Sequence, residues 1–151
     1  MKSQLHSYLI MLGHLCTDIN QGGLPAMLPF LIVAYDLSYA SAAALVFASN
    51  IVSSVIQPLF GYLGDKLDRP WFMSLGIFLA GLGIALLGLV QDYWLLFACA
   101  MLSGIGVALF HPEGGKLANL IAGEKKGTSI SNFSVGGNLG FSIGPILAAV
   151  A

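Results

Sequence analysis

The chain has 151 residues, of which 57% are hydrophobic and only 9% are charged. Soluble domains carry about 25% charged residues, so this composition excludes an ordinary water-soluble surface. The net charge of −1 offers no clustered basic face for nucleic acid. The two cysteines, Cys16 and Cys99, lie inside apolar runs, which is typical of buried free thiols rather than of a disulfide framework.

Apolar runs that cross a lipid bilayer as helices need about 20 residues. We expect five such spans, at residues 5–34, 39–63, 71–90, 93–113 and 128–151. The runs lack the alternation of membrane β-strands, so the sequence predicts an all-α membrane protein. Pro25 and Pro29 predict a bend in the first span. Pro112 predicts that the fourth helix breaks after Phe110, before an amphipathic stretch toward Ile121.

Charge placement predicts the orientation of these spans. All basic residues fall at the N-terminus or in the second and fourth connections, namely at Lys2, Lys66, Arg69, Lys116, Lys125 and Lys126. The opposite connections carry only Asp36 and Asp92. Because cytoplasmic loops are enriched in Lys and Arg, we expect a multi-pass protein of the plasma membrane with a cytoplasmic N-terminus. The apolar last residues lead us to expect a truncated chain.

The first span contains His14, Asp18 and Gln21, which share one helical face at spacings of four and three. A charged side chain at the bilayer centre costs about 2.5–3.5 kcal/mol, so this face should line a wet path or a protein interior. One interpretation is that Asp18 binds and releases protons with His14 beside it. The other is a structural polar cluster. Two ligands do not make a metal site, so no metal is expected.

The fourth span ends on a second group of ionisable residues, His111 and Glu113. Glu113 is a candidate for a second carboxylate in a translocation path, with His111 lining the same cavity. Alternatively, Glu113 pairs with Lys116 at the membrane surface. A membrane-embedded enzyme using His111 and Glu113 is a further alternative. No nucleophile stands in a recognisable arrangement, so we do not expect an enzyme.

In the fifth span, Gly136, Gly140 and Gly144 recur every four residues. Such a stripe lets another helix approach closely. Pro145 follows the stripe and predicts a bend in the same helix.

The second connection reads Gly61-Tyr62-Leu63-Gly64-Asp65-Lys66-Leu67-Asp68-Arg69. It resembles the cytoplasmic signature of the major facilitator superfamily, matched at Gly61, Leu63, Asp65, Lys66 and Arg69. Asp68 replaces the usual glycine. The resemblance implies that Asp65 and Arg69 belong to a charge network that gates the cytoplasmic side. The Gly140 to Pro145 segment looks like an antiporter signature, although Ala148 and Ala149 stand where paired glycines are usual.

The segments from His14 to Pro29, from His111 to Lys116 and from Phe133 to Pro145 resemble the fosmidomycin-resistance group of drug exporters. The resemblance implies most of the N-terminal six-helix half of a facilitator fold. It also implies proton-coupled efflux of a small drug-like or anionic compound, with no cofactor and with a missing C-terminal half as partner. Ala100 stands where many members carry an arginine, so Asp18 or Glu113 is expected to couple protons. An importer of a sugar or organic acid, or a non-transporting scaffold, is the alternative.

Overall fold

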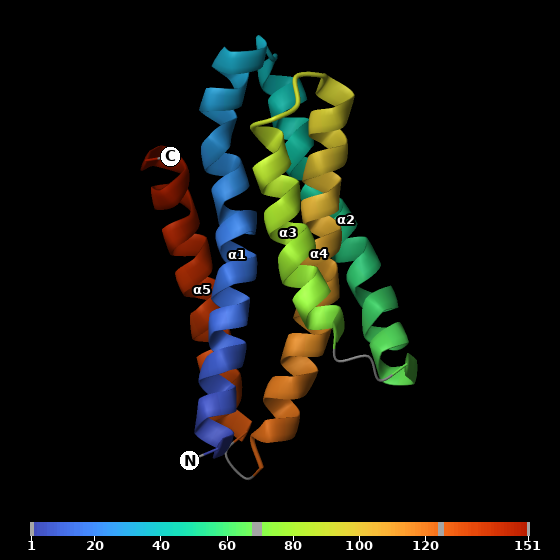
Figure 1. The fold of residues 1–151 in the computed structure, drawn as a ribbon, viewed down its shortest axis with the longest axis vertical. Coiled ribbons are helices and arrows are strands. Elements are labelled where there is room, and N and C mark those ends of the chain that lie inside the picture. The colour runs from blue at the N-terminus through green and yellow to red at the C-terminus, as the bar shows by residue number, and fades with distance from the viewer. Residues whose placement is uncertain (1, 68–70, 124–125, 151) are drawn as a thin grey trace.

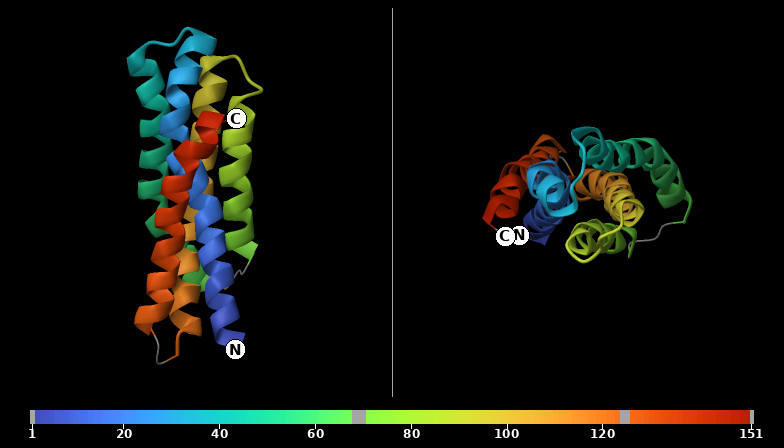
Figure 2. Two further views of the ribbon diagram at one scale, coloured as in Figure 1. Left: turned by 90° about the vertical axis from the view of Figure 1, so that its left-hand side faces the viewer. Right: turned by 90° about the horizontal axis from the view of Figure 1, so that it is seen from above.

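The computed structural model describes residues 2–67, 71–123 and 126–150, and these residues form five α-helices. The helices are α1 (Lys2–Tyr35), α2 (Tyr39–Leu67), α3 (Trp71–Leu87), α4 (Tyr93–Ile121) and α5 (Lys126–Val150). They run up and down the long axis of one bundle, as Figures 1 and 2 show. One end holds the start of α1 and the α2–α3 and α4–α5 connections. We call it the basic end, because Lys66, Lys116 and Lys126 lie toward it.

The all-helical prediction is confirmed, since every element in the described residues is a helix. Three helices, α2, α4 and α5, have the length and hydropathy of membrane spans, and α3 is a shorter apolar helix of 17 residues. The 34 residues of α1 are long enough to span a bilayer, but polar residues interrupt its apolar sequence at mid-length.

Proline interrupts none of these helices, and here the sequence-based prediction for the fourth span was wrong. Instead of breaking after Phe110, α4 continues through Pro112 to Ile121, beyond the expected limit at residue 113. Likewise α1 includes Pro25 and Pro29, and α5 includes Pro145. A proline removes one backbone donor, and packing of the flanking turns against neighbouring helices compensates for that loss. Beyond Pro112, for example, α4 packs Gly114 against the ring of Phe133.

The end opposite the basic end is held by capping and by two tyrosines. Asp92 caps α4, because its carboxylate accepts hydrogen bonds from the backbone N–H groups of Trp94 and Leu95. Tyr35 of α1 donates to the carbonyl of Leu87 at 3.1 Å, and Tyr93 of α4 donates to the carbonyl of Ser41 in α2 at 3.3 Å. These bonds satisfy polar backbone groups near the helix ends and link α1 to α3 and α4 to α2.

The most extensive contact between helices joins α1 to α5, which run in the same direction side by side (Figure 1). Gly136, Gly140 and Gly144 of α5 face backbone carbonyls of α1 that repeat at the same interval of four residues, namely those of Met11, Leu15 and Ile19. A Cβ at Gly140 would lie 2.6 Å from the Leu15 oxygen, which is closer than van der Waals contact allows. The glycine stripe predicted from the sequence therefore packs against α1.

Glycines also allow the other helices to pack closely. A Cβ at Gly76 of α3 would lie 2.8 Å from the Gly106 carbonyl oxygen of α4, and a Cβ at Gly83 would lie 2.6 Å from the Cys99 carbonyl oxygen. Gly104 of α4 meets the backbone of Ser49 in α2. Small residues thus replace the apolar side chains that would separate the helix axes in a water-soluble bundle.

We predict that Gly140→Ala destabilises the bundle by about 1–3 kcal/mol, because the added methyl group meets a backbone carbonyl that cannot rotate away. The measurement is the thermal unfolding midpoint of the purified full-length protein in detergent. Gly81→Ala is the matched control, since a Cβ there meets nothing within 4 Å. Equal midpoints for the two variants would contradict the proposed α1–α5 packing.

Candidate functional site

Three ionisable side chains from α1 and α4 meet inside the bundle. His14 Nε2 lies 3.1 Å from Asp18 Oδ2, one turn along α1. His111 Nε2 of α4 lies 3.1 Å from Asp18 Oδ1 and 3.0 Å from His14 Nε2. His14 and Asp18 are buried, with 8% and 3% of their surface exposed, and His111 is half-buried. We call these three residues the His–Asp cluster.

The backbone of α5 fixes the His14 ring. Nδ1 of His14 lies 2.7 Å from the carbonyl oxygen of Phe133, and a carbonyl only accepts, so Nδ1 carries the proton and donates it. The Phe133 ring stacks on His14 with centroids 3.9 Å apart, and Phe110 lies against the same imidazole at 5.8 Å. These contacts turn Nε2 of His14 toward Asp18 and His111.

This geometry limits where protons can lie within the cluster. With Nδ1 of His14 already donating to Phe133, the contact between His14 Nε2 and Asp18 Oδ2 requires a further proton on one of these atoms. The contact from His111 Nε2 to Asp18 Oδ1 requires another on His111 or on Asp18. An uncompensated charge is unfavourable at a buried site, so protons on these three side chains must balance the charge of Asp18.

Glycines of α5 provide the space for the cluster. A Cβ at Gly137 would lie 2.6 Å from His14 Cε1 and 2.8 Å from Asp18 Oδ2, and a Cβ at Gly140 would lie 2.9 Å from Asp18 Cβ. The α1–α5 contact therefore both packs the helices and forms one wall of the site.

The cluster also has the composition of a metal site, since His14, Asp18 and His111 offer one ligand atom each within 4.8 Å of one another. The sequence suggested only two of these ligands. The polar partners of these atoms at hydrogen-bond distance are one another, as in a hydrogen-bonded cluster. We therefore describe the site as a hydrogen-bonded cluster.

The structure separates other sequence-predicted cavity residues from the cluster. Gln21 of α1 donates a long hydrogen bond of 3.5 Å to Asn50 Oδ1 of α2. Glu113 does not belong to the cluster's hydrogen bonds, and its carboxylate lies against Gly64 of α2. His111, by contrast, is brought to Asp18 by the packing of α4 on α1.

At the basic end, an ion pair links α2 to α4. Lys116 Nζ lies 3.0 Å from Asp65 Oδ1 and donates to the Gly64 carbonyl at 3.3 Å. The Glu113–Lys116 pair considered from the sequence is not among the ion pairs of the described residues. Lys66 Nζ lies 4.5 Å from the centre of the Tyr62 ring in its own helix. Arg69, the other predicted member of the gate, lies outside the described residues, while Gly61 and Leu63 lie on α2.

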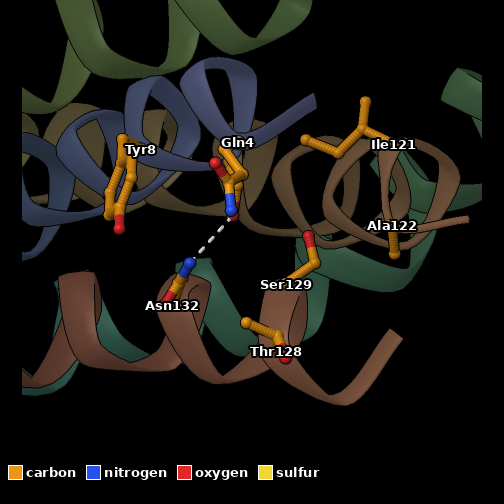
Figure 3. Close-up of a pocket in the computed structure, with 8 residues that line it drawn as sticks. Gln4, Tyr8, Ile121, Ala122, Thr128, Ser129 and Asn132 are labelled. Carbon is orange, nitrogen blue, oxygen red and sulfur yellow. Dashed lines mark hydrogen bonds between the residues drawn. The ribbon is translucent and has the colours of Figure 1, made fainter. Parts of the chain in front are cut away.

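A separate pocket of about 340 Å³ opens at the basic end between α1, the end of α4 and the start of α5. Figure 3 shows its mostly uncharged polar lining, with Gln4 and Tyr8 from α1 facing Thr128, Ser129 and Asn132 from α5. Asn132 donates to Ser7 Oγ at 3.2 Å across the pocket. The pocket contains no member of the His–Asp cluster.

Sequence reasoning missed three contributors to these sites: the Phe133 carbonyl, Gly137 and the role of Lys116. A backbone acceptor leaves no trace in residue type. Gly137 follows Gly136 directly and so lies outside the four-residue stripe that drew attention. From the sequence, Lys116 was considered only as a partner of Glu113 in the same helix, because the tertiary structure alone places Asp65 beside it.

Comparison with known proteins gives a consistent result for nearly the whole chain. Residues 10–151 match the family model of the Major Facilitator Superfamily. The chain is 35% identical over 148 residues to the uncharacterized MFS-type transporter YfnC of Bacillus subtilis, which covers 97% of this chain and 36% of that protein. It is 36% identical over 141 residues to the fosmidomycin resistance protein of Escherichia coli, covering 93% of this chain and 35% of that protein.

Protein spinster of Drosophila melanogaster is a more distant relative, 29% identical over 122 residues that cover 78% of this chain and 20% of that protein. No solved structure shows a significant match. The chain spans about a third of the length of the first two curated relatives. The family match, the helical bundle and the polar residues inside it agree, and the chain belongs to the Major Facilitator Superfamily, a family of multi-pass membrane transporters.

Proposed function

We propose that this chain is part of a proton-coupled exporter of a small drug-like or anionic compound. The buried His–Asp cluster is the observation that carries this proposal, because a carboxylate and two imidazoles at hydrogen-bond distance can bind and release protons. Membership in a transporter family excludes the alternative of an enzyme using His111 and Glu113.

The cluster is suited to alternating access because its members belong to different helices. His14 and Asp18 lie on α1 and His111 lies on α4, so a relative movement of these helices changes the contacts that hold the shared protons. In facilitators, substrate and ion sites lie near the membrane midplane between two halves that rock against each other. The remaining part of the transporter would supply the other wall of the substrate path.

The direction of transport and the substrate class rest on one relative. The fosmidomycin resistance protein is 36% identical over 93% of this chain, and its name refers to resistance against a drug. Drug resistance favours export over import of a sugar or organic acid. Fosmidomycin is therefore the first compound to test. Proton exchange would supply the energy without a cofactor.

The orientation follows from charge. Lys66, Lys116 and Lys126 lie toward the basic end, where the N-terminus also lies (Figure 1). Because basic residues are retained on the cytoplasmic side, this end would face the cytoplasm of a cell bounded by the plasma membrane. The Asp65–Lys116 pair would then close the cytoplasmic side, in the role that the sequence assigned to Asp65, Lys66 and Arg69. Gly136, Gly140 and Gly144 would let α5 slide along α1, with Pro145 favouring bending beyond them.

We predict that Asp18→Asn in the full-length transporter abolishes fosmidomycin efflux driven by a pH gradient, because an amide cannot release the shared proton. Exchange of labelled for unlabelled fosmidomycin at equal pH needs no net proton movement and should persist. Both are measured in reconstituted liposomes. Cys16→Ser on the same helix is the control, since Cys16 is exposed in the structure rather than buried as the sequence suggested.

Two results would separate the alternatives. Efflux by Asp18→Asn that still follows the pH gradient would contradict proton coupling at Asp18. Loss of both efflux and exchange, with an unchanged unfolding midpoint, would indicate that Asp18 contacts the substrate or maintains the shape of the path instead.

The proposed gate leads to a second prediction, on Asp65→Ala and Lys116→Ala. Each change removes the same ion pair between α2 and α4, so each should change the rate of pH-driven efflux by about 1.5-fold to fivefold, as expected for a pair worth about 0.2–1 kcal/mol. The double variant should resemble either single variant. Effects that multiply in the double variant would show that the two residues act independently. Lys126→Ala is the control at the same end.

A further inference from the structure

In the His–Asp cluster, each imidazole nitrogen that points inward faces two partners at once. An imidazole Nε2 has one in-plane direction, which holds either a hydrogen or a lone pair. His14 Nε2 nevertheless lies 3.1 Å from Asp18 Oδ2 and 3.0 Å from His111 Nε2. His111 Nε2 also lies 3.1 Å from Asp18 Oδ1. The two nitrogens and the carboxylate therefore converge on one small region, instead of forming separate hydrogen-bonded pairs.

The surroundings of His14 give it the orientation of a metal ligand. Its Nδ1 donates to the Phe133 carbonyl oxygen at 2.7 Å, so in the neutral ring Nε2 carries a lone pair that points into the cluster. Histidines that bind metal ions almost always donate their other ring N–H to a carbonyl or carboxylate oxygen in this way, which fixes the orientation of the ring. The stacked Phe133 ring, with centroids 3.9 Å apart, holds the imidazole from one side. This orientation is independent of the distances within the cluster.

The spacing of the three groups suits a tetrahedral ion. Zinc binds imidazole nitrogen and carboxylate oxygen at about 2.0–2.2 Å, which places tetrahedral ligand atoms about 3.3–3.6 Å apart. The contacts of 3.0 and 3.1 Å in the cluster need to widen by only a few tenths of an ångström to match. Three protein ligands leave a fourth position for water. Imidazole donors favour divalent transition ions such as Zn²⁺ over Mg²⁺ and Ca²⁺, which prefer oxygen ligands.

Burial and charge also agree with a bound cation. Asp18 supplies a negative charge inside the bundle, where a charge is costly unless it is paired or coordinates a metal. The side chain of His111 is 19% exposed, against 10% for His14 and 5% for Asp18. An ion would therefore enter the cluster from the side of His111.

We propose that the His–Asp cluster is a binding site for one Zn²⁺ ion, with His14 Nε2, His111 Nε2 and the Asp18 carboxylate as its ligands. The bound ion links α1 to α4 and occupies the region that hydrogen bonds hold in its absence. Zinc should therefore inhibit the export proposed above, because it blocks the carboxylate and holds the two helices together. Zinc binding itself depends on neither the direction of transport, the substrate nor the coupling ion.

The test measures zinc binding directly, without transport. The full-length protein is purified in detergent with a tag that contains no histidine, and it is titrated with zinc chloride in a calorimeter. We expect one zinc ion per protein molecule, with magnesium chloride giving no binding. X-ray absorption at the zinc edge of the wild-type complex should show two imidazole ligands together with oxygen. This spectrum needs no variant, so it tests the ligand set even if a variant fails to fold.

Variants then assign the ligands. His14→Gln and His111→Gln keep a polar side chain but remove the imidazole, and each should weaken zinc binding by about 100-fold or more, since even the hydrogen-bond partners of ligands contribute 10-fold to 100-fold. His6→Gln is the matched control, because His6 is an exposed histidine of α1 outside the cluster, and its affinity should equal that of the wild type. The unfolding midpoint without zinc shows whether each variant is folded.

Three results would overturn the proposal: a wild-type protein that binds no zinc, a zinc spectrum without two imidazoles, or a folded His111→Gln variant with wild-type affinity. The outcome is separate from that for the proposed function. A protein that binds zinc at these ligands but whose efflux ignores the pH gradient would retain the zinc site and contradict proton coupling.

Discussion

The direct contact of the α5 backbone with the α1 backbone is the constraint on which the rest of the structure depends. Gly136, Gly140 and Gly144 present no side chain to the carbonyl groups of α1, so the two helices approach until backbone meets backbone. In a membrane, where lipid tails are as apolar as leucine, such close packing replaces the hydrophobic effect as the source of association between helices. A single methyl group on this face would separate the helices.

The same contact also positions the polar chemistry. With α5 this close, the Phe133 carbonyl reaches Nδ1 of His14, and Gly137 leaves room for His14 and Asp18 side by side. His111 is brought to Asp18 by the packing of α4 on α1, where Gly13 faces the ring of Phe110. The glycines therefore allow close helix packing and also determine which ring nitrogen of His14 faces Asp18. A shift of α5 along α1 would change the proton positions within the cluster.

The His–Asp cluster and the α2–α4 contact at the basic end are connected through α4. His111 and Glu113 are two residues apart on this helix, yet His111 contacts α1 while Glu113 contacts α2. Pro112 between them leaves the helix intact, so α4 is continuous through this region. A movement of α4 that opens the contact with Gly64 would also alter the contact between His111 and Asp18. The helix that carries both residues thus joins the His–Asp cluster to the α2–α4 contact at the basic end.

The sequence by itself determined the class of structure and the family. Low charge, long apolar runs and the one-sided placement of Lys and Arg specify a helical membrane bundle, because lipid demands internally bonded backbone and a polar residue in hydrocarbon must have a reason. The sequence also singled out Asp18, His14, His111 and the glycine stripe. Only the tertiary structure decided that His111 joins Asp18, that Lys116 pairs with Asp65, and that Glu113 fills the space at Gly64. Those pairings link residues up to 93 positions apart, and helical periodicity carries no information beyond its own helix. Likewise, the continuity of α4 through Pro112 depends on neighbouring helices that local sequence does not describe.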